Sequence, residues 1–160
     1  MPRPPQQGDM APDFTMSTDG GGEVRLADFR GSSLILYFYP KDGTPGCTTE
    51  ALDFTARIDD FRQAGARIVG VSPDGAARHD RFKAKHGLAF TLASDEDHAV
   101  ALAYGVWAEK SMYGRKFMGV ERSTFLIDGA GRIAGVWPKV KVAGHAEDVL
   151  GAVRDLVGRP

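Results

Sequence analysis

The chain has 160 residues, of which 42% are hydrophobic and 26% charged, and its 20 basic and 21 acidic side chains leave a formal net charge of −1. This balance suits a globular domain with a buried core, and without massed basic residues it gives no reason to expect nucleic acid or a membrane as a partner. The one cysteine excludes an intrachain disulfide, and because MPRPPQQGDM lacks the apolar stretch of a signal peptide we expect a cytoplasmic location.

The N-terminal part of the chain changes character near Asp9. Residues 1–8 are rich in Pro and Gln, which predicts a flexible tail that packs on nothing, and residues 9–160 are expected to form one domain. The turn residues 18–22 separate a short apolar piece from residues 23–26. This arrangement predicts an N-terminal hairpin.

The next segment predicts a βαβ unit. Residues 33–39 form a continuous apolar run, typical of a strand that is covered on both faces. Apolar residues at intervals of three and four after Cys47 predict an amphipathic helix that ends at Gly65. Residues 66–71 then predict a second strand, parallel to the first because a helix separates them.

The remaining elements complete a mixed sheet flanked by helices. Ser72 or Asp74 is expected to cap a helix that ends near Gly87, before a strand at 90–93 and a helical stretch at 95–104. A hairpin is predicted from strands 123–127 and 132–137, and a final helix at 145–157. This order predicts an α/β, thioredoxin-like fold with an N-terminal hairpin extension.

One segment, residues 105–120, shows no regular period and carries several large apolar side chains, among them Trp107, Tyr113 and Phe117. Long aromatic loops are usually functional. Two interpretations stay open: these side chains wall a cleft or form a self-association surface, or they pack in the core.

Cys47 is the candidate reactive residue. It follows the buried strand and a turn rich in Gly and Pro, in or just before the first turn of the predicted helix. Unpaired N–H groups and the helix dipole favour a thiolate there. A lone cysteine is often a small buried apolar residue, but Gly46 and Thr48 flank this one at a strand end, where α/β folds form their crevices.

Several kinds of cysteine chemistry do not fit. A redox-active CxxC pair would need a second cysteine where Glu50 stands. The four histidines lack the spacing of metal ligands, so no metal or cofactor is expected and each histidine is interpreted as a surface or cap residue: His79, His86, His98 and His145. No histidine is designated as the base of a cysteine hydrolase.

The motif PKDGTPGCT resembles the active-site signature of peroxiredoxins. Its TPGCT core, together with YGVWAEKSMYGRKFMGVERSTFLID and KVKVAGH, is similar to the PrxQ branch, also called bacterioferritin comigratory protein. The similarity extends over essentially the whole chain from about Asp9. It implies a thioredoxin-like fold and a thiol-dependent peroxidase that reduces hydrogen peroxide and organic hydroperoxides through a sulfenic acid.

The resemblance also implies a role for each residue of the site. Cys47 is the nucleophile, and the Thr44 hydroxyl hydrogen-bonds the peroxide oxygens. Arg122 stabilises the thiolate and the transition state, Pro40 shields the thiol from solvent, and Glu50 orients the arginine. Without the resemblance, Thr44 would be a turn former, Arg122 a surface residue and Glu50 an acid that stabilises the helix dipole.

The sequence departs from the family pattern at Leu52, where many PrxQ members carry a resolving cysteine. The resemblance then implies a one-cysteine mechanism in which an external thiol reduces Cys47: thioredoxin, glutaredoxin or a low-molecular-weight thiol. The expected assembly is a monomer or a weak homodimer. Two alternatives stay open, a peroxide-sensing redox protein and a non-catalytic binding module with a thioredoxin fold.

Overall fold

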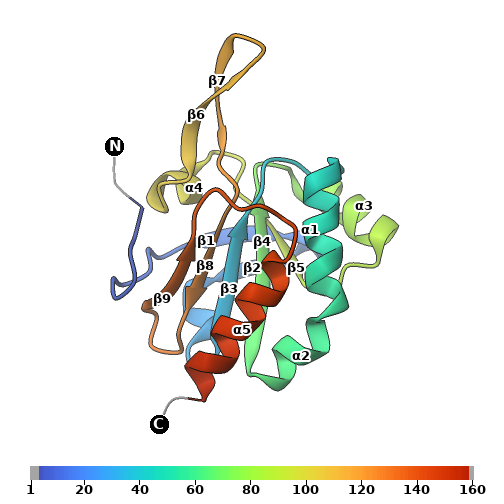
Figure 1. Ribbon diagram of the computed structural model, residues 1–160. Coiled ribbons are helices and arrows are strands. Elements are labelled where there is room, and N and C mark those ends of the chain that lie inside the picture. Colours follow the sequence, from blue (N-terminus) through green and yellow to red (C-terminus); the bar gives the residue numbers. More distant parts are fainter. Residues whose placement is uncertain (1–3, 159–160) are drawn as a thin grey trace.

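The apolar run before Cys47 forms an inner strand of the sheet in the computed structural model, which describes residues 4–158 (Figure 1). The strands are β1 (Thr15–Thr18), β2 (Glu23–Arg25), β3 (Ser33–Phe38), β4 (Ala66–Ser72), β5 (Thr91–Ser94), β6 (Trp107–Met112), β7 (Arg115–Val120), β8 (Ser123–Ile127) and β9 (Ile133–Trp137). The α-helices are α1 (Pro45–Ala56), α2 (Ile58–Gln63), α3 (Ala76–His86), α4 (Ala99–Ala103) and α5 (His145–Val157), with two 3-10 turns, η1 (Asp19–Gly21) and η2 (Leu26–Phe29).

Seven strands form one mixed sheet in the order β2-β1-β5-β4-β3-β8-β9. The β3–β4 and β4–β5 pairs are parallel, whereas β8 runs antiparallel to β3 on its other side. The predicted βαβ unit, the N-terminal hairpin of β1 and β2, and the C-terminal hairpin of β8 and β9 are confirmed. Within residues 4–158, no helix has the length and apolar character that a membrane crossing requires.

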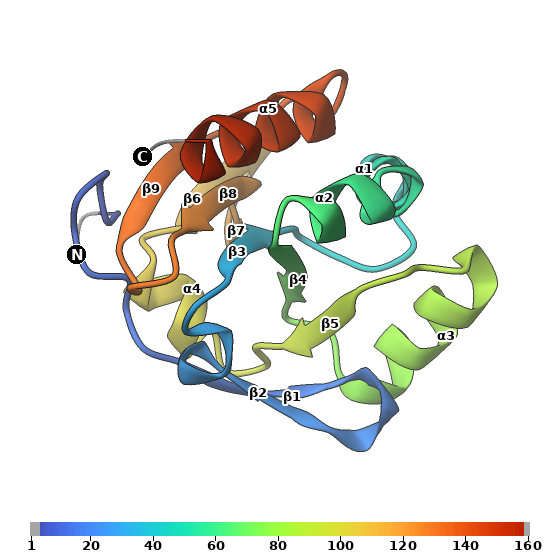
Figure 2. The ribbon, with the colours of Figure 1, turned by 90° about the horizontal axis from the view of Figure 1, so that it is seen from below.

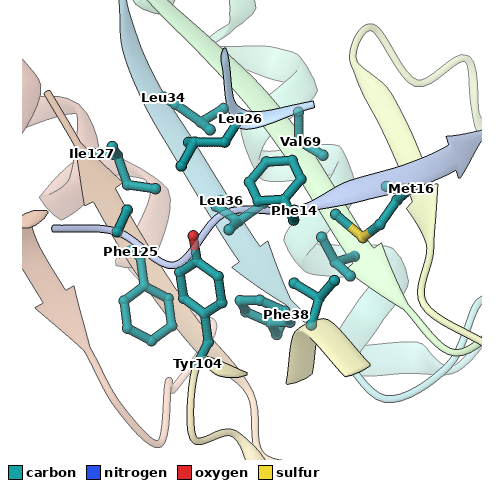
Figure 3. Close-up of a cluster of buried hydrophobic side chains, with 14 of the residues drawn as sticks. Phe14, Met16, Leu26, Leu34, Leu36, Phe38, Val69, Tyr104, Phe125 and Ile127 are labelled. Carbon is teal, nitrogen blue, oxygen red and sulfur yellow. The ribbon is translucent and has the colours of Figure 1, made fainter. Parts of the chain in front are cut away.

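Alternation along β3 builds a separate core on each face of the sheet, because successive side chains of a strand point to opposite sides. Leu34, Leu36 and Phe38 lie in one cluster, where Tyr104 and Phe125 join them (Figure 3). On the other face, residues 35, 37 and 39 pack with apolar side chains of α1, α2 and α5, which Figure 2 shows above the sheet. Both faces are therefore covered, as the continuous apolar run predicted.

The helix boundaries differ from the predictions in three places, one of which is α4, which covers only Ala99–Ala103 of the stretch predicted at 95–104. The helix that begins near Cys47 is divided at Arg57, whose φ of −109° and ψ of 14° separate α1 from α2. Helix α3 begins after Gly75 and has no side-chain cap, so the prediction that Ser72 or Asp74 caps it is wrong. Those two side chains bond each other instead, since the Ser72 hydroxyl donates to Asp74 Oδ2 at 2.7 Å.

The segment 105–120 is a regular hairpin and not a loop, which corrects the prediction. Strands β6 and β7 form their own two-stranded sheet, which projects from the rest of the fold (Figure 1). Tyr113 and Gly114 turn the chain with φ of 53° and 77°, as a two-residue hairpin turn with two positive φ angles requires. Tyr113 is 98% exposed and Phe117 43%, so core packing is the wrong interpretation for both.

The N-terminal segment is also more ordered than predicted. Pro5 is buried, and the Gly8 N–H donates to the Ile133 carbonyl at 2.9 Å. The expectation that the tail packs on nothing is therefore wrong for residues 4–8, in which Pro4 lies beside Gly105 and Gly8 bonds the start of β9. Residues 1–3 of the predicted tail lie outside the described residues.

His145, the first residue of α5, is buried and not a surface residue as predicted. Its Nε2 lies 2.8 Å from the Thr124 hydroxyl of β8, and its ring packs edge-on against Phe54 and Trp137. Burial lowers the pKa of His145 to about 4, with Asp148 opposing and Arg122 reinforcing the shift. The ring is therefore neutral in the fold at neutral pH and fixes the start of α5 to the central sheet.

This histidine makes stability depend on pH. Between about pH 6.5 and pH 4 the unfolded chain binds a proton at His145 that the folded chain excludes, so stability should fall as the pH falls through this range. In urea unfolding followed from pH 7 to pH 4, His145→Gln should remove about 2 kcal/mol of this loss. His86→Gln is the matched control, and an unchanged pH profile in His145→Gln would contradict the prediction.

Candidate active site

The loop between β3 and α1 is held by buried polar contacts of Asp42. Its Oδ1 accepts a hydrogen bond from the Tyr39 hydroxyl, and its Oδ2 lies against Nδ1 of His79 on α3. Nε2 of His79 lies 3.0 Å from the Ala93 carbonyl, so both ring nitrogens face acceptors. These contacts fix the loop to α3 and to the end of β5.

Thr44 precedes α1 as its N-cap residue, but its hydroxyl does not cap the helix. The hydroxyl donates to the Lys41 carbonyl at 2.9 Å, which leaves its oxygen lone pairs available as acceptors. Pro45 follows at the first helical position, where the absent N–H is not needed. Pro40, at the beginning of the loop, is half-buried.

Cys47 is the third residue of α1 and is only 1% exposed. Its Sγ lies 3.3 Å from Nη2 of Arg122. The arginine immediately precedes β8, and pairing of Phe38 with Ser123 places it beside the loop that follows β3. Gly46 makes this approach possible, because a Cβ there would lie 3.1 Å from Nη2 of the arginine.

Glu50 lies one turn after Cys47 and is buried on the same side of α1. Its Oε1 accepts a hydrogen bond from Nη1 of Arg122 at 2.6 Å, while Oε2 has no partner among the described residues. Burial raises the pKa of Glu50 to about 7 even though the guanidinium acts to lower it. Burial alone would lower the pKa of Arg122, but the charges of Glu50 and Cys47 outweigh burial and raise it.

The site therefore joins three of the five predicted residues through direct contacts. One guanidinium bridges the Cys47 sulfur and the Glu50 carboxylate, so a permanent cation lies beside the thiol in a nearly closed environment. Thr44 and Pro40 lie on the loop that leads into the same helix. A cation and a helix N-terminus both favour a thiolate, so the arrangement can support nucleophilic attack by sulfur.

Sequence reasoning missed two features of the site. His79, predicted to be a surface or cap residue, is fully buried; its spacing of three residues from Phe82 places both on the buried face of α3 and could have indicated this. Burial, reinforced by the charge of Arg122, lowers the pKa of Lys110 on β6. The lysine was missed because its strand was interpreted as an irregular loop.

Leu52 does not pack α1 against the sheet, because it is 41% exposed and lies on the outer face of the helix. Ala51 and Phe54, both fully buried, pack α1 against the sheet instead.

Comparison with known proteins supports the peroxiredoxin resemblance. A model of the AhpC/TSA family matches residues 7–136. The chain is 48% identical to peroxiredoxin Bcp of Bacillus subtilis over 149 residues, which cover 93% of this chain and 95% of that protein. It is 41% identical to peroxiredoxin Bcp of Escherichia coli over 152 residues, which cover 95% of this chain and 97% of that protein.

Solved structures show the same fold. A PrxQ mutant of Xylella fastidiosa superposes with a TM-score of 0.90 at 41% identity, covering 95% of this chain and 97% of that one. Peroxiredoxin Q of Xanthomonas campestris gives 0.86 at 50% identity, covering 90% and 91%. The predicted thioredoxin-like fold is confirmed. The chain thus belongs to the AhpC/TSA family and, within it, to the Bcp/PrxQ peroxiredoxins, as a member whose only cysteine is Cys47.

Proposed function

We propose that this peroxiredoxin reduces hydrogen peroxide and organic hydroperoxides through a sulfenic acid on Cys47, with Thr44, Arg122, Glu50 and Pro40 as the other residues of its site. The contact of 3.3 Å between Cys47 Sγ and Arg122 Nη2 carries this proposal. A trapped intermediate and ligand complex of the Xanthomonas bacterioferritin comigratory protein is described for alkyl peroxide reduction, which supports the choice of substrate.

The reaction begins with the thiolate of Cys47. Its sulfur donates an electron pair to one peroxide oxygen, the O–O bond breaks, and the sulfur retains that oxygen as sulfenic acid. The other oxygen leaves as hydroxide or alkoxide and takes a proton to become water or an alcohol. Negative charge moves from sulfur to the leaving oxygen, so the fixed guanidinium of Arg122 stabilises the transition state.

The remaining residues orient and shield these groups. The Thr44 hydroxyl already donates to Lys41, so it positions the substrate by accepting the hydrogen bond of the peroxide O–H. Glu50 holds the guanidinium in place through its bond to Nη1. Pro40, half-buried and without an N–H, limits the access of water to the thiol.

An external thiol completes the cycle, since no second cysteine exists in the chain. Thioredoxin, glutaredoxin and small thiols are the candidate donors. A reducing cytoplasm would supply each of them, and the domain at residues 9–160 is expected to act as a monomer or weak homodimer. The absence of a resolving cysteine favours one second function, a peroxide sensor, which would be oxidised rapidly but reduced slowly by every donor.

The arginine can be tested through the oxidation rate. Arg122→Met should slow oxidation of Cys47 by hydrogen peroxide about 100-fold, measured by stopped flow, because the transition state loses its cation. The substitution also leaves the buried Glu50 carboxyl unpaired, so a double variant with Glu50→Gln serves as the control for stability. The double variant should recover stability but not rate; recovery of the rate would contradict a direct role of the arginine.

Substitutions at Thr44 test whether the hydroxyl group, and not only the shape of the side chain, takes part in the reaction. Thr44→Val should slow the same oxidation by about two orders of magnitude, because the isostere cannot accept the peroxide hydrogen bond. Thr44→Ser should retain most of the rate. Equal rates for the valine variant and the parent would show that the hydroxyl has no part in the reaction.

The one-cysteine cycle predicts a sequence of masses. Without thiol, equimolar peroxide should add one oxygen to the intact protein, and excess peroxide should add a second as the sulfenic acid becomes sulfinic acid. A dithiol added after the first stage should restore the starting mass. A disulfide-linked dimer as the main product of the equimolar stage would mean that a second subunit resolves the thiol.

A further inference from the structure

A groove of about 460 Å³ lies between the active-site loop and α3. Gly43 and Thr48, the immediate neighbour of Cys47, line one side. Buried Phe82 contributes an apolar surface, and its ring packs edge-on against His86. The volume falls within the range of small-molecule sites.

The groove is positively charged. Arg78, Arg81 and Lys85 line it from exposed positions on α3. Arg78 pairs with Asp74 at 3.2 Å, whereas Arg81 and Lys85 form no ion pair with any residue from 4 to 158.

Acidic groups do not neutralise this charge. Asp42 is the one acidic side chain that lines the groove, and both of its oxygens are engaged, by Tyr39 and by His79. A groove with this lining attracts an anion.

The groove is also lined by Thr48, the residue that follows the reacting cysteine. Cys47 is only 1% exposed, and loosening of the first turn of α1 after oxidation would open its sulfur to a thiol. That turn includes the hydrogen bond from Thr48 N to Thr44 O at 2.9 Å. Because Thr48 forms part of the groove wall, loosening of this turn exposes position 47 beside the groove.

We propose that this groove binds the reductant, and that the reductant is a small thiol carrying a carboxylate or another anionic group. The inference rests on the proposed one-cysteine cycle and specifies its donor. Arg81 and Lys85 hold the anionic group, and Phe82 contacts the carbon chain. The thiol end then reaches the oxidised sulfur at the N-terminus of α1.

The chemistry balances with two equivalents of thiol. The thiolate of the first attacks the Cys47 sulfur, an S–S bond forms, the S–O bond breaks, and the leaving hydroxide takes a proton to become water. A second thiolate attacks the donor sulfur of the mixed disulfide and releases the Cys47 thiolate. Two thiols are oxidised to one disulfide while the sulfenic acid is reduced by two electrons.

The test uses the full chain, oxidised with one equivalent of hydrogen peroxide and checked by intact mass for a gain of one oxygen. The oxidised protein is mixed with 2-mercaptoethanesulfonate, 2-mercaptoethanol or cysteamine at equal thiolate concentrations, and loss of the oxygen is followed by quenched mass analysis. The anionic thiol should react about 10-fold faster than the cationic one and its rate should saturate with concentration. High salt should reduce the rate advantage of the anionic thiol over the cationic one.

Charge reversal in the groove tests whether its basic residues cause the preference for the anionic thiol. The double variant Arg81→Glu/Lys85→Glu should lose the preference for the anion and the saturation. Arg62→Glu, an exposed charge reversal on α2, is the matched control and should retain both. Equal rates for the three thiols would overturn the inference and leave the peroxidase proposal standing, and so would an equal loss of the anion preference in the two variants. Failure of the protein to gain the first oxygen would overturn both proposals.

Discussion

The ion pair between Arg122 and Glu50 is the interaction on which the site depends. The guanidinium is half-buried and Glu50 is fully buried, so removal of either partner would leave a charge poorly compensated. Glu50 supplies the partner at 2.6 Å and leaves Nη2 directed at the Cys47 sulfur. The same contact thus compensates the guanidinium charge and fixes the cation beside the thiol.

Much of the frame that holds this pair follows from local sequence. The apolar run of β3 and the spacing after Cys47 predict a strand, a turn and a helix, because burial on both faces and a helical period leave clear patterns. The contact between Glu50 and Arg122 spans 72 residues and has no local signal. Only the family resemblance placed these two residues together, since antiparallel pairing of β8 with β3 cannot be derived from either segment alone.

The errors have a common physical origin. Large apolar side chains in β6 and β7 suggested a buried or irregular segment, but a hairpin that projects from the fold exposes Tyr113 and Phe117, whereas Trp107 at its base packs against the core. The turn places Tyr113 at a positive φ that is uncommon for such a residue. The prediction of a surface position for His79 is wrong for the opposite reason. A polar side chain was assigned to the surface, although a buried carboxylate and a carbonyl satisfy both of its nitrogens.

The Asp42–His79 pair connects the two halves of the proposed cycle. It fixes the loop that carries Thr44 to α3, and α3 carries the basic residues of the groove. The first turn of α1, with Thr48 of the groove wall, can therefore loosen around Cys47 while the basic residues on α3 stay in place, because the loop anchor lies before the helix and Phe54 packs after it. A site that must be closed for peroxide and open for a thiol needs such a short mobile turn between two fixed points.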